Sequence, residues 1–150
     1  MEIIENGFVF SDDANKIDTL AVHRFLSTES YWAREIPLET VIRSIRHSLC
    51  FGIYKETVQV GFARWITDTA TFAYLADVYI EKQYRGLGLS KKLMSLMLFH
   101  EDLQGLRRYQ LATQDAHGLY SQFGFKALEE PENQMAVVIK NAYQDKTQQG

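Results

Sequence analysis

The sequence predicts a single mixed α/β domain, in which an antiparallel meander is followed by alternating helices and strands. Three β-type segments, 49–54, 58–66 and 71–80, follow one another with only short polar turns between them, which favours antiparallel neighbours. After these segments the spacing of apolar residues changes from that of a strand to that of a helix, over 87–100. With 150 residues, 46% of them hydrophobic, the chain is long enough to enclose one packed core.

One strand and two helices are expected before the meander. The segment 7–11 is of β type and ends in Ser-Asp-Asp at 11–13, which offers helix caps. Apolar residues then recur at helical spacing over 17–25. A second helix is expected over 37–45, since Pro37 suits a first helical turn and the apolar positions after it fall on one face.

The segments after the meander alternate between the two periods. The helix of 87–100 is followed by a strand over 107–112 and a short helix over 115–123. Two further strand-like segments, 125–128 and 135–140, are expected to close the sheet. The resulting element order is β-α-α-β-β-β-α-β-α-β-β.

One domain is expected over residues 1–143, and the polar segment 144–150 is expected to be a flexible tail. The net charge of −3 gives no basic field for nucleic acid or for an anionic membrane. No stretch approaches the ~18 apolar residues of a membrane span, and the N-terminus lacks the apolar run of a signal peptide, so a cytoplasmic protein is expected. The single cysteine, Cys50, excludes an intrachain disulfide, and no metal site is expected.

The most informative segment is 83–92, Gln-Tyr-Arg-Gly-Leu-Gly-Leu-Ser-Lys-Lys, which follows a strand and opens the helix of 87–100. Gly86 and Gly88 allow the backbone to approach a ligand closely, and the first amides of the helix lack partners within it. This arrangement suits a phosphate or pyrophosphate. Lys91 stands where a dinucleotide fingerprint needs a small residue, and the glycines are too close together for a nucleotide-triphosphate loop.

The pattern Gln-x-x-Gly-x-Gly after the strand Leu75–Ile80 resembles the acyl-coenzyme-A site of the GCN5-related N-acetyltransferases, the GNAT family. A later segment, Leu111–Phe125, resembles the family's second motif, with Leu-Tyr on a short helix and Gly-Phe leading onward. Alone, that segment is equally typical of a glycine-capped helix with aromatic core residues. Both motifs stand in the family's order, although the family often has Asn where this chain has Thr113. The expected elements match the GNAT fold over nearly the whole chain.

The resemblance implies a splayed central sheet that holds acetyl-CoA. The main chain of Val78 and Ile80 would pair with the pantetheine arm, and the N–H of Val78 would bind the acetyl carbonyl oxygen. Arg85, Lys91 and Lys92 would add positive charge near the pyrophosphate, but the two lysines could equally form a solvated helix face. The full set of expected cofactor-binding residues is Val78, Tyr79, Ile80, Gln83, Arg85, Gly86, Leu87, Gly88, Leu89, Ser90, Thr113, His117 and Tyr120.

Tyr120 occupies the position of the family's general acid. A phenol with a pKa of ~10 is close enough to a thiol with a pKa of ~8.5 to pass it a proton as the C–S bond breaks. The alternative is a core aromatic residue with a satisfied hydroxyl group.

Asp77 is a charged residue within an apolar strand segment, where its free-energy cost requires a partner or a task. It could accept the proton of the acceptor amine or orient the ammonium group. The alternative is a structural carboxylate bonded to the backbone or to Arg64. Asp115 and His117 are other candidates for the base.

The acceptor is expected to lie between the connection of the first two helices and the splayed strand. Tyr31 and Trp32 are adjacent aromatic residues in that connection and could form an apolar or cation-binding wall, or could simply pack on the core. Arg64 and Tyr74 are further candidates, together with Asp77. Strand alternation separates Arg64 from Trp65, so at most one of them is expected to face the acceptor.

The leading interpretation is an acetyl-CoA-dependent N-acetyltransferase that transfers the acetyl group directly to the primary amine of a small molecule. One alternative is the same chemistry on a protein N-terminus or lysine, and another is an acyl-CoA sensor without catalysis. A homodimer would be in keeping with the resemblance, since the family often dimerises.

Overall fold

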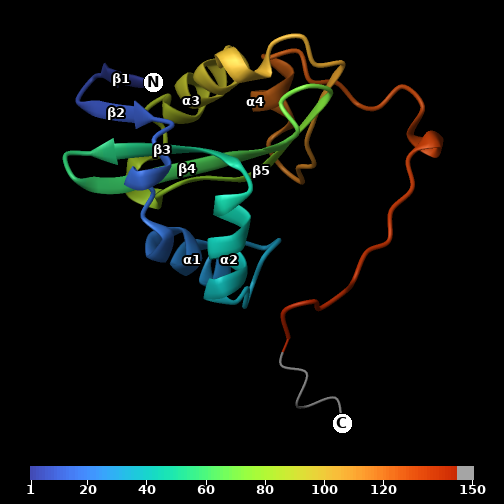
Figure 1. The fold of residues 1–150 in the computed structure, drawn as a ribbon, viewed down its shortest axis with the longest axis horizontal. Helices are drawn as coiled ribbons and strands as arrows, with labels where there is room; N and C mark the ends of the chain where they lie inside the picture. Colours follow the sequence, from blue (N-terminus) through green and yellow to red (C-terminus); the bar gives the residue numbers. More distant parts are fainter. Residues whose placement is uncertain (145–150) are drawn as a thin grey trace.

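The computed structural model describes residues 1–144 and contains a six-stranded sheet with helices on both faces (Figure 1). The strands lie in chain order across the sheet: β1 (Glu2–Glu5), β2 (Phe8–Ser11), β3 (Leu49–Lys55), β4 (Val58–Thr67), β5 (Phe72–Ile80) and β6 (Arg108–Gln110). The helices are α1 (Thr19–Thr28), α2 (Leu38–Arg46), α3 (Leu89–Leu98) and α4 (His117–Ser121). Helices α1 and α2 cover one face, and α3 and α4 cover the other. The predicted mixed α/β fold class is confirmed.

The strands from β1 to β5 pair in antiparallel fashion, and β6 is parallel to β5. The predicted meander of three antiparallel strands is therefore present as β3, β4 and β5. The parallel contact is short, because it joins only Phe72–Tyr74 of β5 to Arg108–Gln110 of β6. Beyond this contact the described residues give the second half of β5 no neighbour on that side.

The sheet separates two hydrophobic cores. Trp65 and Met97 are fully buried between the sheet and α3, where the indole N–H of Trp65 donates to the Met97 carbonyl (3.3 Å). Leu26 and Phe62 are fully buried on the side of α1 and α2. Because side chains alternate along β4, Arg64 lies on the opposite face from Trp65, as predicted.

Side-chain caps set the start of the first two helical segments. The carboxylate of Asp13 accepts from the Asn15 amide and begins a 3-10 turn, η1 (Ala14–Lys16). The carboxylate of Asp18 accepts from the Ala21 amide (3.0 Å) and begins α1, so this helix starts after the first apolar residue of the predicted repeat. Pro37 is the N-cap of α2.

Strand β1 was not indicated by the sequence pattern, because its residues are exposed and lack apolar alternation. It forms a hairpin with β2 through Asn6 and Gly7, whose φ angles are 50° and 81°. Asn-Gly is the preferred pair for a two-residue hairpin turn with positive φ at both positions. This dipeptide was the signal that could have revealed the strand.

The expectation that 125–128 and 135–140 close the sheet is wrong for the described residues, which place neither segment in a strand. After α4 the chain leaves the body of the molecule, as the orange-to-red ribbon of Figure 1 shows. Apolar alternation indicates which segments suit a strand, but a strand also requires a neighbouring edge. Strand 107–112 is shortened to β6, and helix 115–123 is shortened to α4.

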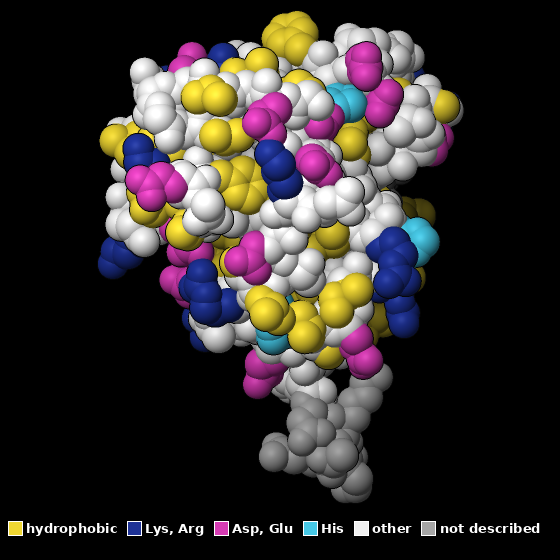
Figure 2. All heavy atoms as spheres, turned by 60° about the vertical axis from the view of Figure 1, so that its left-hand side comes forward, with side chains coloured by type: hydrophobic (Ala, Val, Ile, Leu, Met, Phe, Trp, Pro, Cys, Tyr) yellow, Lys and Arg dark blue, Asp and Glu magenta, His cyan; other side chains and the backbone are white. Residues whose placement is uncertain are grey.

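The described surface carries both signs of charge. On the face drawn in Figure 2, Lys and Arg side chains are interspersed with Asp and Glu. None of the helices within residues 1–144 combines the length and apolar character that a membrane span requires. Residues 145–150 of the expected tail lie outside the described part of the chain.

The hydroxyl of Tyr54 on β3 is buried and has no hydrogen-bond partner among residues 1–144. Gly52 leaves room for it, because a Cβ at this position would overlap the Tyr54 phenol. A buried hydroxyl without a partner costs free energy. Tyr54→Phe is therefore expected to raise the free energy of unfolding by about 1 kcal/mol, measured by urea denaturation. A decrease would show that a buried water satisfies the hydroxyl.

Candidate functional site

A β-bulge interrupts the pairing of β4 with β5 just beyond the point where β5 and β6 separate. Phe62 pairs with Tyr79 and Arg64 pairs with Ala76, so two residues of β5, Asp77 and Val78, stand opposite one residue of β4. Asp77 has a φ of 56°, a left-handed conformation that Asp tolerates better than a β-branched residue such as Val. The bulge removes the Val78 main chain from the ladder and increases the local twist. An Asp inside an apolar strand was the sequence signal for it.

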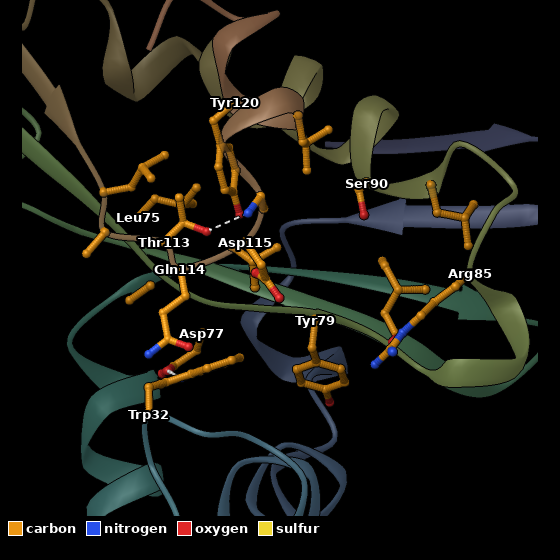
Figure 3. Close-up of a pocket in the computed structure, with 18 of the residues that line it drawn as sticks. Trp32, Leu75, Asp77, Tyr79, Arg85, Ser90, Thr113, Gln114, Asp115 and Tyr120 are labelled. Atoms are coloured by element: carbon orange, nitrogen blue, oxygen red, sulfur yellow. Dashed lines mark hydrogen bonds between the residues drawn. The ribbon is translucent and has the colours of Figure 1, made fainter. Parts of the chain in front are cut away.

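A cavity of about 1020 Å³ lies where β5 and β6 separate. It runs from the glycine turn before α3, past the free edge of β5 and Tyr120 of α4, to the loop that holds Tyr31 and Trp32 (Figure 3). The segment Leu111–Ala116, which follows β6, forms the opposite wall. The predicted cofactor and acceptor regions are thus parts of one continuous cavity.

The glycine turn has the conformation that its residues predict. Gly86 and Gly88 have φ angles of 80° and 79°, and Gly88 is the N-cap of α3 without a side-chain cap. A Cβ at either glycine would meet nothing within 4 Å, so the backbone conformation, rather than crowding, requires glycine here. The first amides of α3, at Leu89 and Ser90, have no acceptor inside the helix and lie at the cavity wall.

Positive charge gathers beside these amides. The Nε–H of Arg85 donates to the Ile80 carbonyl (2.9 Å), which fixes the turn to the end of β5, and its guanidinium group points toward the cavity (Figure 3). Lys91 lines the cavity. Lys92 instead forms an ion pair with Glu5 of β1 (3.5 Å). Of the two lysines, one therefore adds to the field of the helix N-terminus.

Tyr120 is 8% exposed and lines the cavity from α4. Its ring packs edge-on against Phe125, with ring centroids 6.1 Å apart, and its hydroxyl makes no hydrogen bond to any described residue. Burial, followed by the nearby Tyr31 and Asp115, raises the pKa of Tyr120. The phenol is therefore a protonated donor at neutral pH. The Thr113 hydroxyl accepts from the Ala116 amide (3.0 Å) and caps the turn into α4.

Asp77 has partners on both carboxylate oxygens. Its Oδ2 accepts from Nε of Arg64 (2.7 Å) and its Oδ1 accepts from the indole N–H of Trp32 (2.8 Å). The side chains of Asp77 and Arg64 are 10% and 14% exposed, and Arg64 also donates to the hydroxyl of Ser48 (2.8 Å). The structural alternative for Asp77, a carboxylate bonded to Arg64, is thus present in the molecule.

Aromatic side chains line the acceptor end of the cavity, and both are partly exposed to solvent, Tyr31 by 50% and Trp32 by 42%. The rings of Tyr31 and Trp32 pack edge-to-face with their centroids 4.9 Å apart. The backbone N–H of Gln114 donates to the Tyr31 hydroxyl (3.4 Å). The loop therefore bridges the two sides of the opening. Glu29 is paired with Arg24 (3.3 Å). Asp115 lines the cavity and has no ion-pair partner among residues 1–144.

The structure brings most of the predicted site residues to one cavity. Those that line it are Tyr31, Trp32, Tyr74, Asp77, Val78, Tyr79, Ile80, Arg85, Gly86, Gly88, Leu89, Ser90, Thr113 and Tyr120. Although Tyr79 lines it, its ring is stacked on Phe25 of α1 (4.0 Å between centroids), so the side chain belongs to the core.

Four predicted residues are not part of the lining. Gln83 lies on an exposed 3-10 turn, η2 (Lys82–Tyr84), and Leu87 is 59% exposed. His117 is exposed on α4, and Arg64 reaches the cavity only through Asp77. A motif gives positions along the chain, but it does not give the direction of each side chain. Tyr84 and Gln114 also line the cavity, although nothing in the sequence singled them out as site residues; Leu119 lines it too and belongs to the Leu-Tyr pair of the second motif.

Comparisons with known proteins agree with this geometry. Residues 46–127 match the family model described as the acetyltransferase (GNAT) domain. A Gibberella zeae protein assigned as an acetyltransferase is 31% identical over 155 residues, covering 88% of this chain and 86% of that protein.

Solved structures show the same fold. A crystal structure from Xanthomonas campestris, assigned to the GNAT family, has 47% identity and a TM-score of 0.90 and covers 92% of this chain and 97% of that chain. A Clostridium acetobutylicum acetyltransferase solved with acetyl-CoA shares the fold at 12% identity, with a TM-score of 0.59 over 87% of this chain and 93% of that chain. This chain belongs to the GNAT family of acetyltransferases.

Proposed function

We propose that this acetyltransferase uses acetyl-CoA and transfers the acetyl group directly to the primary amine of a small molecule. One observation carries the proposal: a continuous cavity joins an amide-rich, positively charged turn to a bulged strand edge, a protonated tyrosine and an end lined by aromatic side chains. Each feature corresponds to one requirement of acyl transfer from a thioester.

The turn before α3 suits the pyrophosphate of coenzyme A. The amides of Leu89 and Ser90, the guanidinium of Arg85 and the ammonium of Lys91 provide directed donors and positive charge. The free edge of β5 after the bulge offers main-chain groups of Val78 and Ile80 to an extended pantetheine arm. The solved relative that holds acetyl-CoA has the same fold, which supports this assignment.

Two groups of this chain would serve the chemical step. The Val78 N–H, which the bulge removes from the β4 ladder, would donate to the carbonyl oxygen as negative charge develops there. The Tyr120 hydroxyl would give its proton to the departing sulfur. Acetyl-CoA supplies the activated acyl group, and the amine must reach it unprotonated.

We assign the proton of the amine to an acceptor other than Asp77, because Asp77 forms a buried ion pair with Arg64 and its protonation would leave that cation buried without a partner. Asp115 lines the cavity and has no ion-pair partner within the described chain, so it is our candidate for attracting the ammonium form and for taking its proton through water. Asp77 is proposed to act as a positioning residue that holds Trp32 in the acceptor wall.

The loop that bridges the two sides of the acceptor end favours a small molecule over a protein. The Tyr31–Trp32 loop is tied to β5 through Asp77 and to Gln114 through the Tyr31 hydroxyl, whereas a protein segment would need an open groove. A panel of small amines and of lysine and N-terminal peptides, assayed by release of coenzyme A thiol, tests this. Turnover of peptides alone would establish a protein acetyltransferase, and binding of acetyl-CoA without any turnover would establish a sensor.

Gly86→Val is expected to weaken coenzyme A binding by about tenfold or more, equivalent to about 1.4 kcal/mol. A β-branched residue resists the positive φ of Gly86, and its Cβ would project into the space in front of the turn. Gly105→Val is the matched control, because Gly105 has a φ of 82°, also faces open space, and lies outside the cavity lining. Equal binding by both variants in calorimetry would place the cofactor elsewhere.

Trp32→Phe and Asp77→Asn are expected to raise the KM for the acceptor while coenzyme A affinity stays within a few-fold. Trp32→Phe removes the bond that ties the acceptor loop to β5. Asp77→Asn leaves one amide oxygen to accept from both Trp32 and Arg64, and Asn still tolerates the positive φ at position 77. Steady-state kinetics separates the roles. If Asp77→Asn abolished kcat and Trp32→Phe had no effect, Asp77 would be the base and not a positioning residue.

Tyr120→Phe is expected to lower kcat by about 10²–10⁴, the usual contribution of a general acid, with little change in coenzyme A affinity. Since burial raises the pKa of Tyr120, loss of its proton should not reduce kcat until the pH exceeds the ordinary tyrosine value of about 10. Tyr54→Phe serves as the control, because it removes a buried hydroxyl outside the cavity lining. Full activity of Tyr120→Phe would exclude the acid role.

A further inference from the structure

Ser48 connects the end of α2 to the side chain of Arg64. Its hydroxyl donates to the Ser44 carbonyl in the last turn of α2 (2.6 Å) and accepts from Nη1 of Arg64 (2.8 Å). Its backbone N–H donates to the Ile45 carbonyl (3.3 Å). Carbonyls at a helix C-terminus lack partners within the helix, and Ser48 supplies them. The two bonds to α2 fix the direction in which the Ser48 oxygen faces Arg64.

Three hydrogen bonds lead in series from Ser48 to the acceptor loop. Ser48 accepts from Arg64, and Asp77 accepts from both Arg64 (2.7 Å) and the indole N–H of Trp32 (2.8 Å). The two inner side chains, Arg64 and Asp77, are 14% and 10% exposed, so little solvent competes for these bonds. We refer to Ser48–Arg64–Asp77–Trp32 as the hydrogen-bond series.

Trp32 depends on this series for its orientation. The ring lines the cavity but is 42% exposed, and the Tyr31 ring packed against it is 50% exposed. The indole N–H is the only polar group of the side chain, and Asp77 accepts from it, as Figure 3 shows by the position of Asp77 beside the ring. The direction of the ring therefore follows the position of the Asp77 carboxylate.

The position of Asp77 in turn depends on how firmly Arg64 is held. Hydrogen bonds to a charged group are stronger than those between neutral groups, and Arg64 makes one to Asp77 and one to Ser48. The Ser48 bond also places the guanidinium group at the C-terminal end of α2, where the helix dipole favours a positive charge. Without the Ser48 hydroxyl, Asp77 alone would hold Arg64, and the link to α2 would be lost.

We propose that Ser48 is a positioning residue for the acceptor site, which fixes the Trp32 ring in the acceptor wall through Arg64 and Asp77. This inference rests on the proposed function in one respect, the assignment of the Tyr31–Trp32 end of the cavity to the acceptor. Ser48 does not line the cavity, so its influence on the acceptor passes through the hydrogen-bond series. The last turn of α2 thereby contributes to acceptor binding from outside the cavity.

Acrylamide quenching of tryptophan fluorescence tests the series without acetyl-CoA and without turnover. The protein has two tryptophans, and Trp65 is fully buried, so quenching reports on Trp32 and the Trp32→Phe protein gives the background. Ser48→Ala is expected to raise the quenching of Trp32, because the ring loses its fixed direction. Equal quenching of Ser48→Ala and the parent protein would overturn the proposal.

Ser44→Ala is the matched control for this measurement. The Ser44 hydroxyl donates to the Val41 carbonyl (2.8 Å) and takes no part in the series, whereas the Ser44 carbonyl that anchors Ser48 stays in place. This variant should be quenched like the parent, and a change as large as that of Ser48→Ala would reduce the role of Ser48 to general stability of α2. Ser48→Cys, whose thiol accepts hydrogen bonds only weakly, replaces Ser48→Ala if the latter does not fold.

Steady-state kinetics with an accepted amine separates positioning from a general loss of structure. Ser48→Ala is expected to raise the acceptor KM about fivefold, which corresponds to one hydrogen bond of about 1 kcal/mol, with kcat and coenzyme A affinity unchanged. Ser48→Thr keeps the hydroxyl and should restore the parental KM. An equal loss in kcat and in coenzyme A affinity would contradict the positioning role.

A double-mutant cycle tests whether Ser48 acts through Trp32. The KM of Ser48→Ala/Trp32→Phe should be no higher than that of Trp32→Phe alone, because both changes interrupt the same series. Additive effects of the two changes would show that Ser48 acts by another route and would refute the proposal. If no amine is acetylated, the proposed function fails, while the quenching result still decides whether Ser48 orients Trp32.

Discussion

The buried ion pair between Arg64 and Asp77 is the interaction on which the geometry of the site depends. Both side chains are largely withdrawn from solvent, and such a pair is stable only when further hydrogen bonds satisfy the remaining donors and acceptors. Trp32 and Ser48 provide them. The pair thereby joins β4 and β5 to the acceptor loop and to the end of α2, and it holds Asp77 in a left-handed conformation that costs about 1–3 kcal/mol by itself.

The cavity exists because the sheet is incompletely paired. The bulge at Asp77 withdraws Val78 from β4, and the early end of β6 leaves the second half of β5 without a neighbour on the other side. The crossover from β5 through α3 to β6 then brings the N-terminus of α3 to the end of β5. Main-chain groups on a strand edge and amides at a helix N-terminus meet at the same opening, which is the usual place for ligands at the carboxyl ends of strands.

The two outer strands of the sheet, β1 and β6, differ in how their free edges are protected from further pairing. β1 is short, and its Glu2 and Glu5 form ion pairs with Lys16 and Lys92, so charged side chains cover this edge in the way expected of a protected strand. The β6 edge has no further strand beside it in the described residues, and the segment Lys126–Glu130 forms a groove of about 530 Å³ along it.

The sequence by itself determined the types of the main helices and strands between residues 7 and 123, the antiparallel meander, the glycine turn and the short helix that carries Tyr120. These are local properties: the spacing of apolar residues distinguishes helix from strand, and only glycine accepts the positive φ of positions 86 and 88 without strain. The Asn6-Gly7 turn and the capping residue Asp18 were equally local, so β1 and the start of α1 were within reach of the sequence.

Only the tertiary structure decided which side chains contact one another and which of them face the cavity. Whether Asp77 would meet an amine or Arg64, and whether Lys91 or Lys92 would face the cavity, depended on residues distant in the chain. Gln83, Leu87 and His117 occupy motif positions, but their elements direct them outward. The segments 125–128 and 135–140 show the same limit. Apolar alternation describes one strand, whereas pairing requires a neighbouring edge, and the described residues pair neither segment with one.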